Sequence, residues 1–114
     1  MGSEMCIRDR SLLEALSNDS LVTDALVDRY WELLRFPGNR HALSLRASTD
    51  RQAHYAEQMD KIATPTLVLW GADDSVRPLA DAYTFVSKIV DSELVVLTNV
   101  GHAPMEEDLS LIHI

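Results

Sequence analysis

The fold is decided by the stretch Thr66–Pro78, TLVLWGADDSVRP, together with a second stretch, Leu94–His102, LVVLTNVGH. Each contains a short apolar run, rich in β-branched residues, that is followed by a glycine. Runs of this kind predict β-strands, which we place at residues 66–70 and 93–98. Two aspartates follow the first glycine and a histidine follows the second. The sequence therefore predicts two strands, one leading to an acid and the other to a base.

The residues between the two strands predict a helix. Apolar residues recur at helical spacing from Leu79 to Val90, and Pro78 stands where the first turn of a helix tolerates proline. A crossover helix between two strands favours parallel pairing in one sheet. Ligands of open parallel sheets bind outside the carboxyl ends of the strands, where Asp74 and His102 would lie. We therefore expect the Asp74 carboxylate and the His102 imidazole to be within bonding reach.

A carboxylate beside an imidazole provides two members of a catalytic relay. The carboxylate fixes the tautomer of the ring and stabilises the imidazolium, which leaves the other ring nitrogen to act as a general base. A nucleophile would complete the relay. No serine of this sequence stands in a Gly-x-Ser-x-Gly context, so we assign none of them to that role.

Two motifs make the chain resemble the α/β-hydrolase superfamily. Residues 71–78, GADDSVRP, resemble the Gly-x-x-Asp-x-x-x-Pro segment that carries the acid of the catalytic triad. Residues 101–107, GHAPMEE, resemble the Gly-His-x-x-x-x-Glu segment that carries the base. The resemblance implies that Asp74, rather than Asp73, is the acid and that His102 is the base. It also implies an α/β fold class, with a helical cap remnant followed by the last two parallel strands and a crossover helix.

Both ends of the chain resemble translated sequencing-library adapter. One adapter strand encodes Met-Cys-Ile-Arg-Asp, which occupies residues 5–9, and its reverse complement encodes Leu-Ser-Leu-Ile-His-Ile, which occupies residues 109–114. We therefore interpret residues 1–10 and 109–114 as non-native ends of a truncated, metagenomic-type sequence. Residues 11–49 are expected to be the end of the cap and residues 50–108 the C-terminal part of the hydrolase core.

Helices are predicted throughout the cap region. A short helix and a turn are expected over residues 11–21, and a second helix is expected to begin after the N-cap candidate Thr23 and to end at Phe36–Asn39. Two further helical segments are expected over residues 40–49 and 50–61. The predicted order is thus helices first and then strand, helix, strand.

Three residues are candidates for the substrate pocket, namely Trp31, Val76 and Ala103. Trp31 and Tyr30 share an aromatic face of the second predicted helix, where they either pack against other helices or line a substrate pocket. Val76 and Ala103 are near neighbours of the acid and the histidine in the sequence.

The composition limits the classes of partner. The chain has 114 residues and a net charge of −8, which argues against a nucleic-acid or anionic-membrane surface and is compatible with a small-molecule substrate. No apolar run approaches the roughly 20 residues of a membrane-spanning helix. The only cysteine lies within residues 1–10, which fits a reducing compartment and leads us to expect a cytoplasmic location. The oligomeric state is left open.

No metal or cofactor is expected. The sequence has no cluster of histidine, cysteine and acidic residues at metal-ligand spacing, and it has no phosphate-binding glycine loop. Apart from His102 and the histidine of the C-terminal adapter segment, the remaining histidines, His41 and His54, are predicted on helix surfaces.

Two functional hypotheses follow from the sequence. The first is a fragment of an α/β-hydrolase that cleaves an ester, amide, epoxide, carbon–carbon or carbon–halogen bond through a nucleophile, His102 and Asp74. The nucleophile is Ser, Asp or Cys. Without the nucleophile elbow, the turn that carries this residue, we expect the fragment to be inactive. Because its strand edges are unpaired, we also expect it to be marginally stable. The alternative is a non-catalytic α/β ligand-binding module. The residue at the nucleophile position upstream would distinguish the two.

Overall fold

The two strands form the centre of the C-terminal half. The computed structural model describes residues 9–49 and 53–111. Within this part, β1 (Thr66–Gly71) and β2 (Ser92–Leu97) pair in parallel along their whole lengths. The helix α5 (Leu79–Lys88) connects them. The predicted strand, helix, strand order is confirmed, with the element ends shifted by one or two residues.

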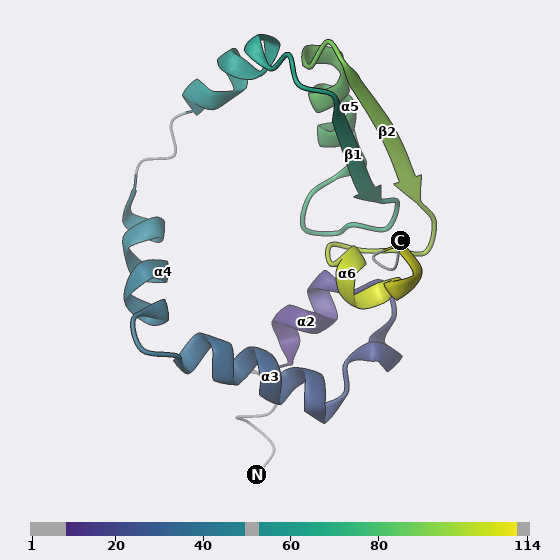
Figure 1. The fold of residues 1–114 in the computed structure, drawn as a ribbon. Coiled ribbons are helices and arrows are strands. Elements are labelled where there is room, and N and C mark those ends of the chain that lie inside the picture. The colour runs from purple at the N-terminus through teal and green to yellow at the C-terminus, as the bar shows by residue number, and fades with distance from the viewer. Residues whose placement is uncertain (1–8, 50–52, 112–114) are drawn as a thin grey trace.

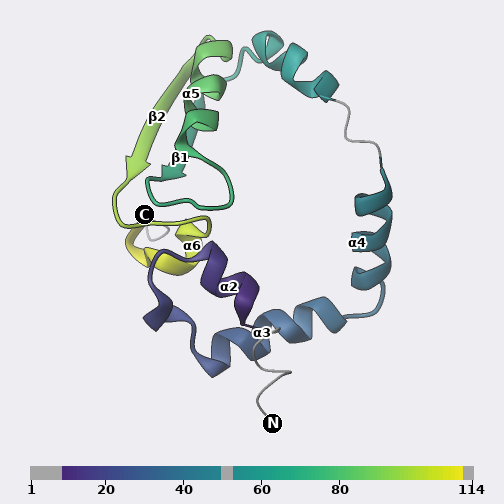
Figure 2. The ribbon, with the colours of Figure 1, turned by 180° about the vertical axis from the view of Figure 1, so that it is seen from behind.

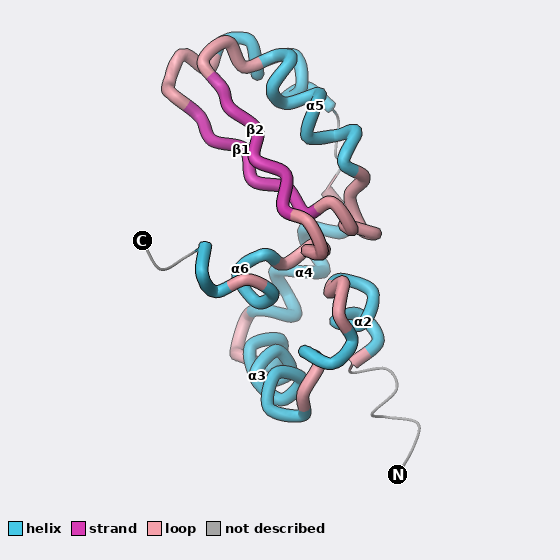
Figure 3. The backbone as a smooth tube through the Cα atoms, turned by 90° about the vertical axis from the view of Figure 1, so that its right-hand side faces the viewer, coloured by secondary structure: helices cyan, strands magenta, loops and turns pink. Residues whose placement is uncertain are grey.

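One face of the sheet is covered and the other is open. The helix α5 packs against one face (Figure 3), where Trp70 and Phe85 approach with ring centroids 6.0 Å apart and Ala82 is completely buried. The side chains of Leu67 and Leu69 point away from α5 and remain 58% and 43% exposed. An uncovered apolar face is expected of two strands that belong in a larger parallel sheet, and the exposure of Leu67 and Leu69 confirms it.

Helices and 3₁₀ turns occupy the N-terminal half. They are α2 (Arg10–Ala15), the 3₁₀ helix η1 (Asp19–Leu21), α3 (Asp24–Arg35), α4 (Asn39–Ser48) and the 3₁₀ helix η2 (Ala53–Lys61). None of the helices in the described ranges is both long enough and apolar enough to cross a membrane.

The boundaries of α3 follow from its sequence. The hydroxyl of Thr23 accepts a hydrogen bond from the amide of Leu26 at 3.2 Å, which confirms the predicted N-cap. At the other end Gly38 adopts a φ of 90°, a left-handed conformation that glycine accepts easily, and the chain turns there into α4. The helical segment expected over 50–61 is a 3₁₀ helix where it is described, and residues 50–52 lie outside the described part.

After β2 the chain ends in two short turns. The helix α6 (Pro104–Glu107) follows the histidine, and the 3₁₀ helix η3 (Leu109–Leu111) follows α6. The helix α5 is shorter than predicted because Ile89 is already extended, and Val90, which we had placed on the apolar helix face, is 88% exposed.

The chain as a whole traces a ring. It passes from α2 through α3, α4 and η2 to the strands, and α6 returns to lie beside α2 (Figures 1 and 2). The radius of gyration is 16.7 Å, against about 13 Å for a compact domain of this length. The buried apolar side chains are correspondingly few: Leu12, Leu16, Val27, Ala82, Ile89, Leu97 and Val100.

The open sheet face predicts self-association. We expect the double substitution Leu67→Thr and Leu69→Thr to increase the monomer fraction in size-exclusion chromatography, because it removes an exposed apolar surface beside unpaired strand edges. The urea midpoint should change little, because exposed substitutions usually alter stability by no more than about 0.5 kcal/mol.

The control is Val68→Thr, on the half-buried face toward α5. It should lower the free energy of unfolding by about 1 kcal/mol without increasing the monomer fraction. Equal association of the double variant and the native chain would contradict the role of the open face.

Candidate active site

The two strands deliver two loops to the same edge of the sheet. We call residues 72–78 the acid loop and residues 98–102 the histidine loop. The amide of Asp73 donates to the carbonyl of Val100 at 3.0 Å, which joins the two loops. Asn99 adopts a left-handed backbone with a φ of 59°, a conformation that asparagine tolerates better than most residues. The strand ends and these bonds place the two loops side by side.

Asp74 and His102 are in contact. The Asp74 Oδ2 atom lies 2.9 Å from His102 Nδ1. The other oxygen, Oδ1, accepts hydrogen bonds from the amides of Val76 at 2.9 Å and Arg77 at 2.8 Å. Only 6% of the Asp74 side chain is exposed, compared with 42% of the His102 side chain. The acid is therefore fixed by its own loop, and the imidazole reaches solvent.

The hydrogen bonds around Asp74 keep it ionised. Burial by itself raises the pKa of Asp74, but the amides of Arg77 and Val76 and the ring of His102 outweigh it and leave the pKa below the ordinary 3.8. An ionised carboxylate can only accept, so His102 Nδ1 carries the proton in this contact. No described residue is seen to hydrogen-bond to Nε2.

Close approach of the backbones requires glycine at two positions. A Cβ atom at Gly71 would lie 2.1 Å from the carbonyl oxygen of Gly101 and 2.3 Å from that of Val100. A Cβ atom at Gly101 would lie 2.6 Å from the carbonyl oxygen of Ala15 and 2.8 Å from the amide nitrogen of Ser17. Both glycines therefore allow the histidine loop to fit between β1 and the N-terminal segment.

The N-terminal segment binds the histidine loop directly. The amide of His102 donates to the carbonyl of Ala15 at 2.7 Å, and the hydroxyl of Ser17 lies 2.7 Å from the carbonyl of Asn99. The hydroxyl of Ser75, in the acid loop, donates to the carbonyl of Glu14. We call the contact of residues 14–17 with the two loops and α6 the seam, because it closes the ring.

A carboxylate lies at the centre of the seam. Glu107 Oε2 accepts from the Ser17 amide at 2.8 Å and from its hydroxyl at 2.6 Å, while Oε1 accepts from the Gly101 amide at 2.8 Å. Burial raises the pKa of Glu107, but these donors outweigh it and hold the pKa below the ordinary 4.5. The motif Gly-His-x-x-x-x-Glu contained this residue, but nothing in the sequence indicated Ser17 as its partner.

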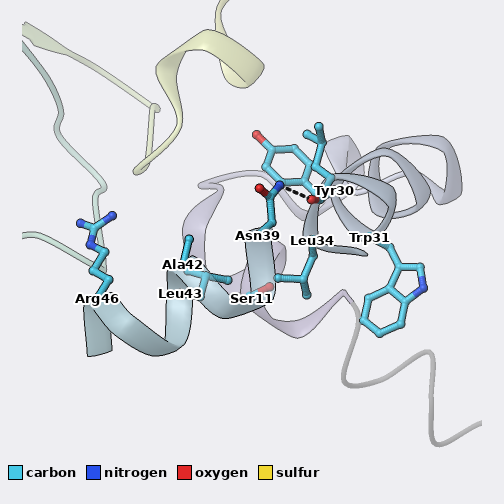
Figure 4. A pocket seen from close by; sticks show the side chains of 9 residues that line it. Ser11, Tyr30, Trp31, Leu34, Asn39, Ala42, Leu43 and Arg46 are labelled. Atoms are coloured by element: carbon cyan, nitrogen blue, oxygen red, sulfur yellow. Dashed lines mark hydrogen bonds between the residues drawn. The ribbon is translucent and has the colours of Figure 1, made fainter. Parts of the chain in front are cut away.

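The candidate pocket residues do not line the hollow beside the acid and base. That hollow, of about 140 Å³, is lined by Leu69, Trp70, Gly71, Asp74, Gly101, His102 and Pro104. Trp31 instead lines a cavity of about 570 Å³ between α3 and α4, at the opposite end from Arg46 (Figure 4). Val76 is exposed and contributes its amide to Asp74, and Ala103 is half-buried at the start of α6. A substrate contact of these three residues stays a prediction.

Three further charged or titratable residues, Asp73, His41 and Arg77, give no side-chain hydrogen bond to Asp74 or His102 in the described part of the chain. Asp73 is exposed, and His41 is exposed on α4. The side chain of His54 lies outside the described part. Arg77 donates to Asp74 through its backbone amide, not through its guanidinium. In the residues that the structure describes, no group of three or more histidine, cysteine or acidic side chains could hold a metal ion.

Several known proteins are similar to this chain, although no protein-family profile matches it. The 2-hydroxy-6-oxo-6-(2'-aminophenyl)hexa-2,4-dienoic acid hydrolase of Metapseudomonas resinovorans is 31% identical over 101 residues, which are 84% of this chain and 35% of that protein. A monoacylglycerol lipase of Rattus norvegicus is 39% identical over 51 residues, 45% of this chain and 15% of that protein. The chain thus spans 35% or less of the length of these relatives.

A solved structure has the same fold. The meta-cleavage product hydrolase from Pseudomonas fluorescens superposes with a TM-score of 0.75 at 22% identity, over 92% of this chain and 41% of that one. The chain belongs to the α/β-hydrolase superfamily. Its described residues are a partial α/β-hydrolase fold, in which helices precede two parallel strands and a crossover helix. The family resemblance and the fold class expected from the two motifs are confirmed.

The two carboxylates predict the pH dependence of stability of this α/β-hydrolase segment. Because the folded-state pKa values of Asp74 and Glu107 lie below 3.8 and 4.5, ionisation of both groups favours the fold. Their contribution is complete above these ordinary values and is lost as the pH falls through the lowered ones. We expect the urea midpoint to fall over that acidic range, and Asp74→Asn and Glu107→Gln to have a flatter profile. Identical profiles in all three proteins would contradict the stabilising role.

Gly71 should be intolerant of a side chain. We expect Gly71→Ala to cost about 1–3 kcal/mol because its Cβ must displace the backbone of the histidine loop. The ¹⁵N shifts of the His102 ring should report loss of the Asp74 contact. Gly38→Ala is the control, because it introduces φ strain at a position with no atom within 4 Å of the new Cβ. Gly38→Ala should destabilise the fold without moving the His102 signals. A shift of these signals in both variants would contradict a specific effect of Gly71→Ala on the contact between Asp74 and His102.

Proposed function

We propose that this chain supplies the acid and the base of a hydrolase, with Asp74 orienting His102 and His102 acting as the general base. The observation that supports this most strongly is the 2.9 Å contact between Asp74 Oδ2 and His102 Nδ1 at the carboxyl end of two parallel strands. The order of acid before histidine fits the superfamily. The nucleophile, Ser, Asp or Cys, would come from residues outside this chain.

The geometry supports a defined role for each nitrogen of His102. Nδ1 donates to the ionised Asp74 and is held there, so Nε2 has the lone pair that accepts a proton from a nucleophile or from the hydrolytic water. The imidazolium that results is stabilised by the same carboxylate. The hollow of about 140 Å³ beside the two residues gives a reacting group access to this side.

We further propose that residues 11–49 are the end of a cap and that residues 50–108 belong to the hydrolase core, with adapter-derived sequence at residues 1–10 and 109–114. The partial coverage of every relative named above supports a segment of a longer protein. So does the open sheet face, where Leu67 and Leu69 would find partners in a larger sheet and its helices.

The similar proteins suggest which bond to test first. The similarity to the dienoic acid hydrolase extends over 101 residues, and that to the monoacylglycerol lipase over 51. We therefore favour a small-molecule substrate of the 2-hydroxy-6-oxo-dienoic acid class for the intact enzyme, with carboxylic esters as the second class. Both reactions are hydrolyses and need no cofactor.

The chain by itself should have no turnover. A base without a nucleophile or an oxyanion hole lacks most of the rate enhancement of such enzymes. We expect the purified 114-residue chain to hydrolyse p-nitrophenyl acetate no faster than His102→Ala does. Hydrolysis that depends on His102 and exceeds that of free imidazole at the same concentration would show that the chain contains its own nucleophile.

Recovery of the coding sequence upstream tests the proposal as a whole. We expect a nucleophile elbow there, and in the intact enzyme a loss of about 10⁴-fold in kcat for Asp74→Asn, because the asparagine amide is uncharged and its NH₂ group, in the place of Oδ2, donates to Nδ1 and favours the wrong tautomer of His102. His102→Ala should lose at least as much, and His41→Ala should remain active. An upstream chain without a nucleophile at that position would favour the ligand-binding module instead.

A further inference from the structure

Two consecutive acids of α6 bind different parts of the N-terminal half. Glu106 Oε1 accepts from the guanidinium of Arg29 and from the Tyr30 hydroxyl at 3.0 Å, both on α3. Glu107 binds Ser17 and the Gly101 amide instead. The two acids have the same charge and adjacent positions in the sequence, but only one of them contacts the histidine loop.

The Glu107 contacts fix the backbone immediately before the histidine. Gly101 donates to Oε1, and His102 in turn donates its amide to Ala15 at 2.7 Å. Ser17 donates its amide to Oε2, so one carboxylate connects the histidine loop to the segment that accepts the His102 amide. The Ser17 hydroxyl has a single proton, which it shares between Glu107 at 2.6 Å and the Asn99 carbonyl at 2.7 Å.

The backbone of Gly101 is closely surrounded by this carboxylate and by the N-terminal segment. The position of a Cβ on Gly101 would be 3.0 Å from Glu107 Oε1 and closer still to the backbone of Ala15 and Ser17. The His102 ring, 42% exposed, contacts Asp74 at Nδ1 but has no other bond to a described residue. Its orientation therefore depends on how firmly the backbone of the loop is held.

We propose that Glu107 is a positioning residue, which clamps Gly101 against Ser17 so that the imidazole of His102 presents Nδ1 to Asp74. The role of this clamp in catalysis rests on the function proposed above. The clamp as a structural contact does not depend on that function. Glu107 touches no reacting atom. It acts through the backbone of the histidine loop, and Glu106 has no part in this.

The test compares Glu107→Gln with Glu106→Gln in the full 114-residue chain. Glutamine has one acceptor oxygen where glutamate has two, so Glu107→Gln must lose the bond to Ser17 or the bond to Gly101. We expect amide hydrogen exchange at Gly101 and His102 to accelerate about 10-fold or more, because these bonds involve a charged acceptor. The ¹⁵N shifts of the His102 ring should move away from those of the Nδ1–H tautomer.

Glu106→Gln should leave both signals unchanged, although it weakens the bonds to Arg29 and Tyr30. Unaltered exchange and ring shifts in Glu107→Gln would overturn the proposal, and so would equal effects of the two variants. If Glu107→Gln does not fold, Glu107→Asp replaces it, since the aspartate carboxylate is one methylene too short to reach both the Ser17 amide and the Gly101 amide. Faster exchange at Gly101 in that variant supports the clamp, and unchanged exchange overturns it.

These measurements are independent of turnover. A failed hydrolase assay would not change the measured exchange rates of Gly101 and His102. Loss of the clamp would not change which residue is the upstream nucleophile. The two proposals therefore fail separately.

Discussion

The site depends on the close approach of two pieces of backbone at one edge of the sheet. The end of β1 at Gly71 lies against the carbonyls of Val100 and Gly101, at a separation that leaves no space for a Cβ. Parallel pairing brings the strand ends level, and the missing side chains let the two loops touch. The contact between Asp74 and His102 is a consequence of this arrangement, because both side chains project from backbone that is already fixed.

Asp74 combines a structural role in the acid loop with its proposed catalytic role. One oxygen serves the turn, by accepting from the amides of Val76 and Arg77, and the other serves the imidazole. The turn bonds lower the pKa of the acid, so the carboxylate that holds the loop is also ionised when it meets the ring. A structural role and a proposed catalytic role thus rest on the same side chain without competing for the same atom.

The sequence predicted the local elements better than the long-range contacts. Apolar runs, glycines and the Thr23 cap indicated the strands and helices, because these signals act over a few residues. The meeting of Asp74 and His102 was also predictable, since parallel strands deliver their ends to one edge. The open face at Leu67 follows from an apolar strand that lacks the rest of a parallel sheet. The pairing of Ser17 with Glu107 was not predictable, because it depends on which distant segments come together.

Among the described residues the ring closes at the seam and at the neighbouring contact of Glu106 with Arg29 and Tyr30, and this makes the N-terminal segment exchangeable. Joining Ser17 to Glu107 encloses about ninety residues, which costs roughly 4 kcal/mol of chain entropy. When the seam opens, Ala15 and Ser17 of a second copy of the chain can make the same hydrogen bonds to the histidine loop and Glu107. A second chain can then insert its own α2 at lower entropic cost as the concentration rises, which gives a swapped dimer with two intact seams. The geometry around His102 would be preserved in each half of such a pair. The Ala15 carbonyl that accepts from the His102 amide would then belong to the neighbouring chain.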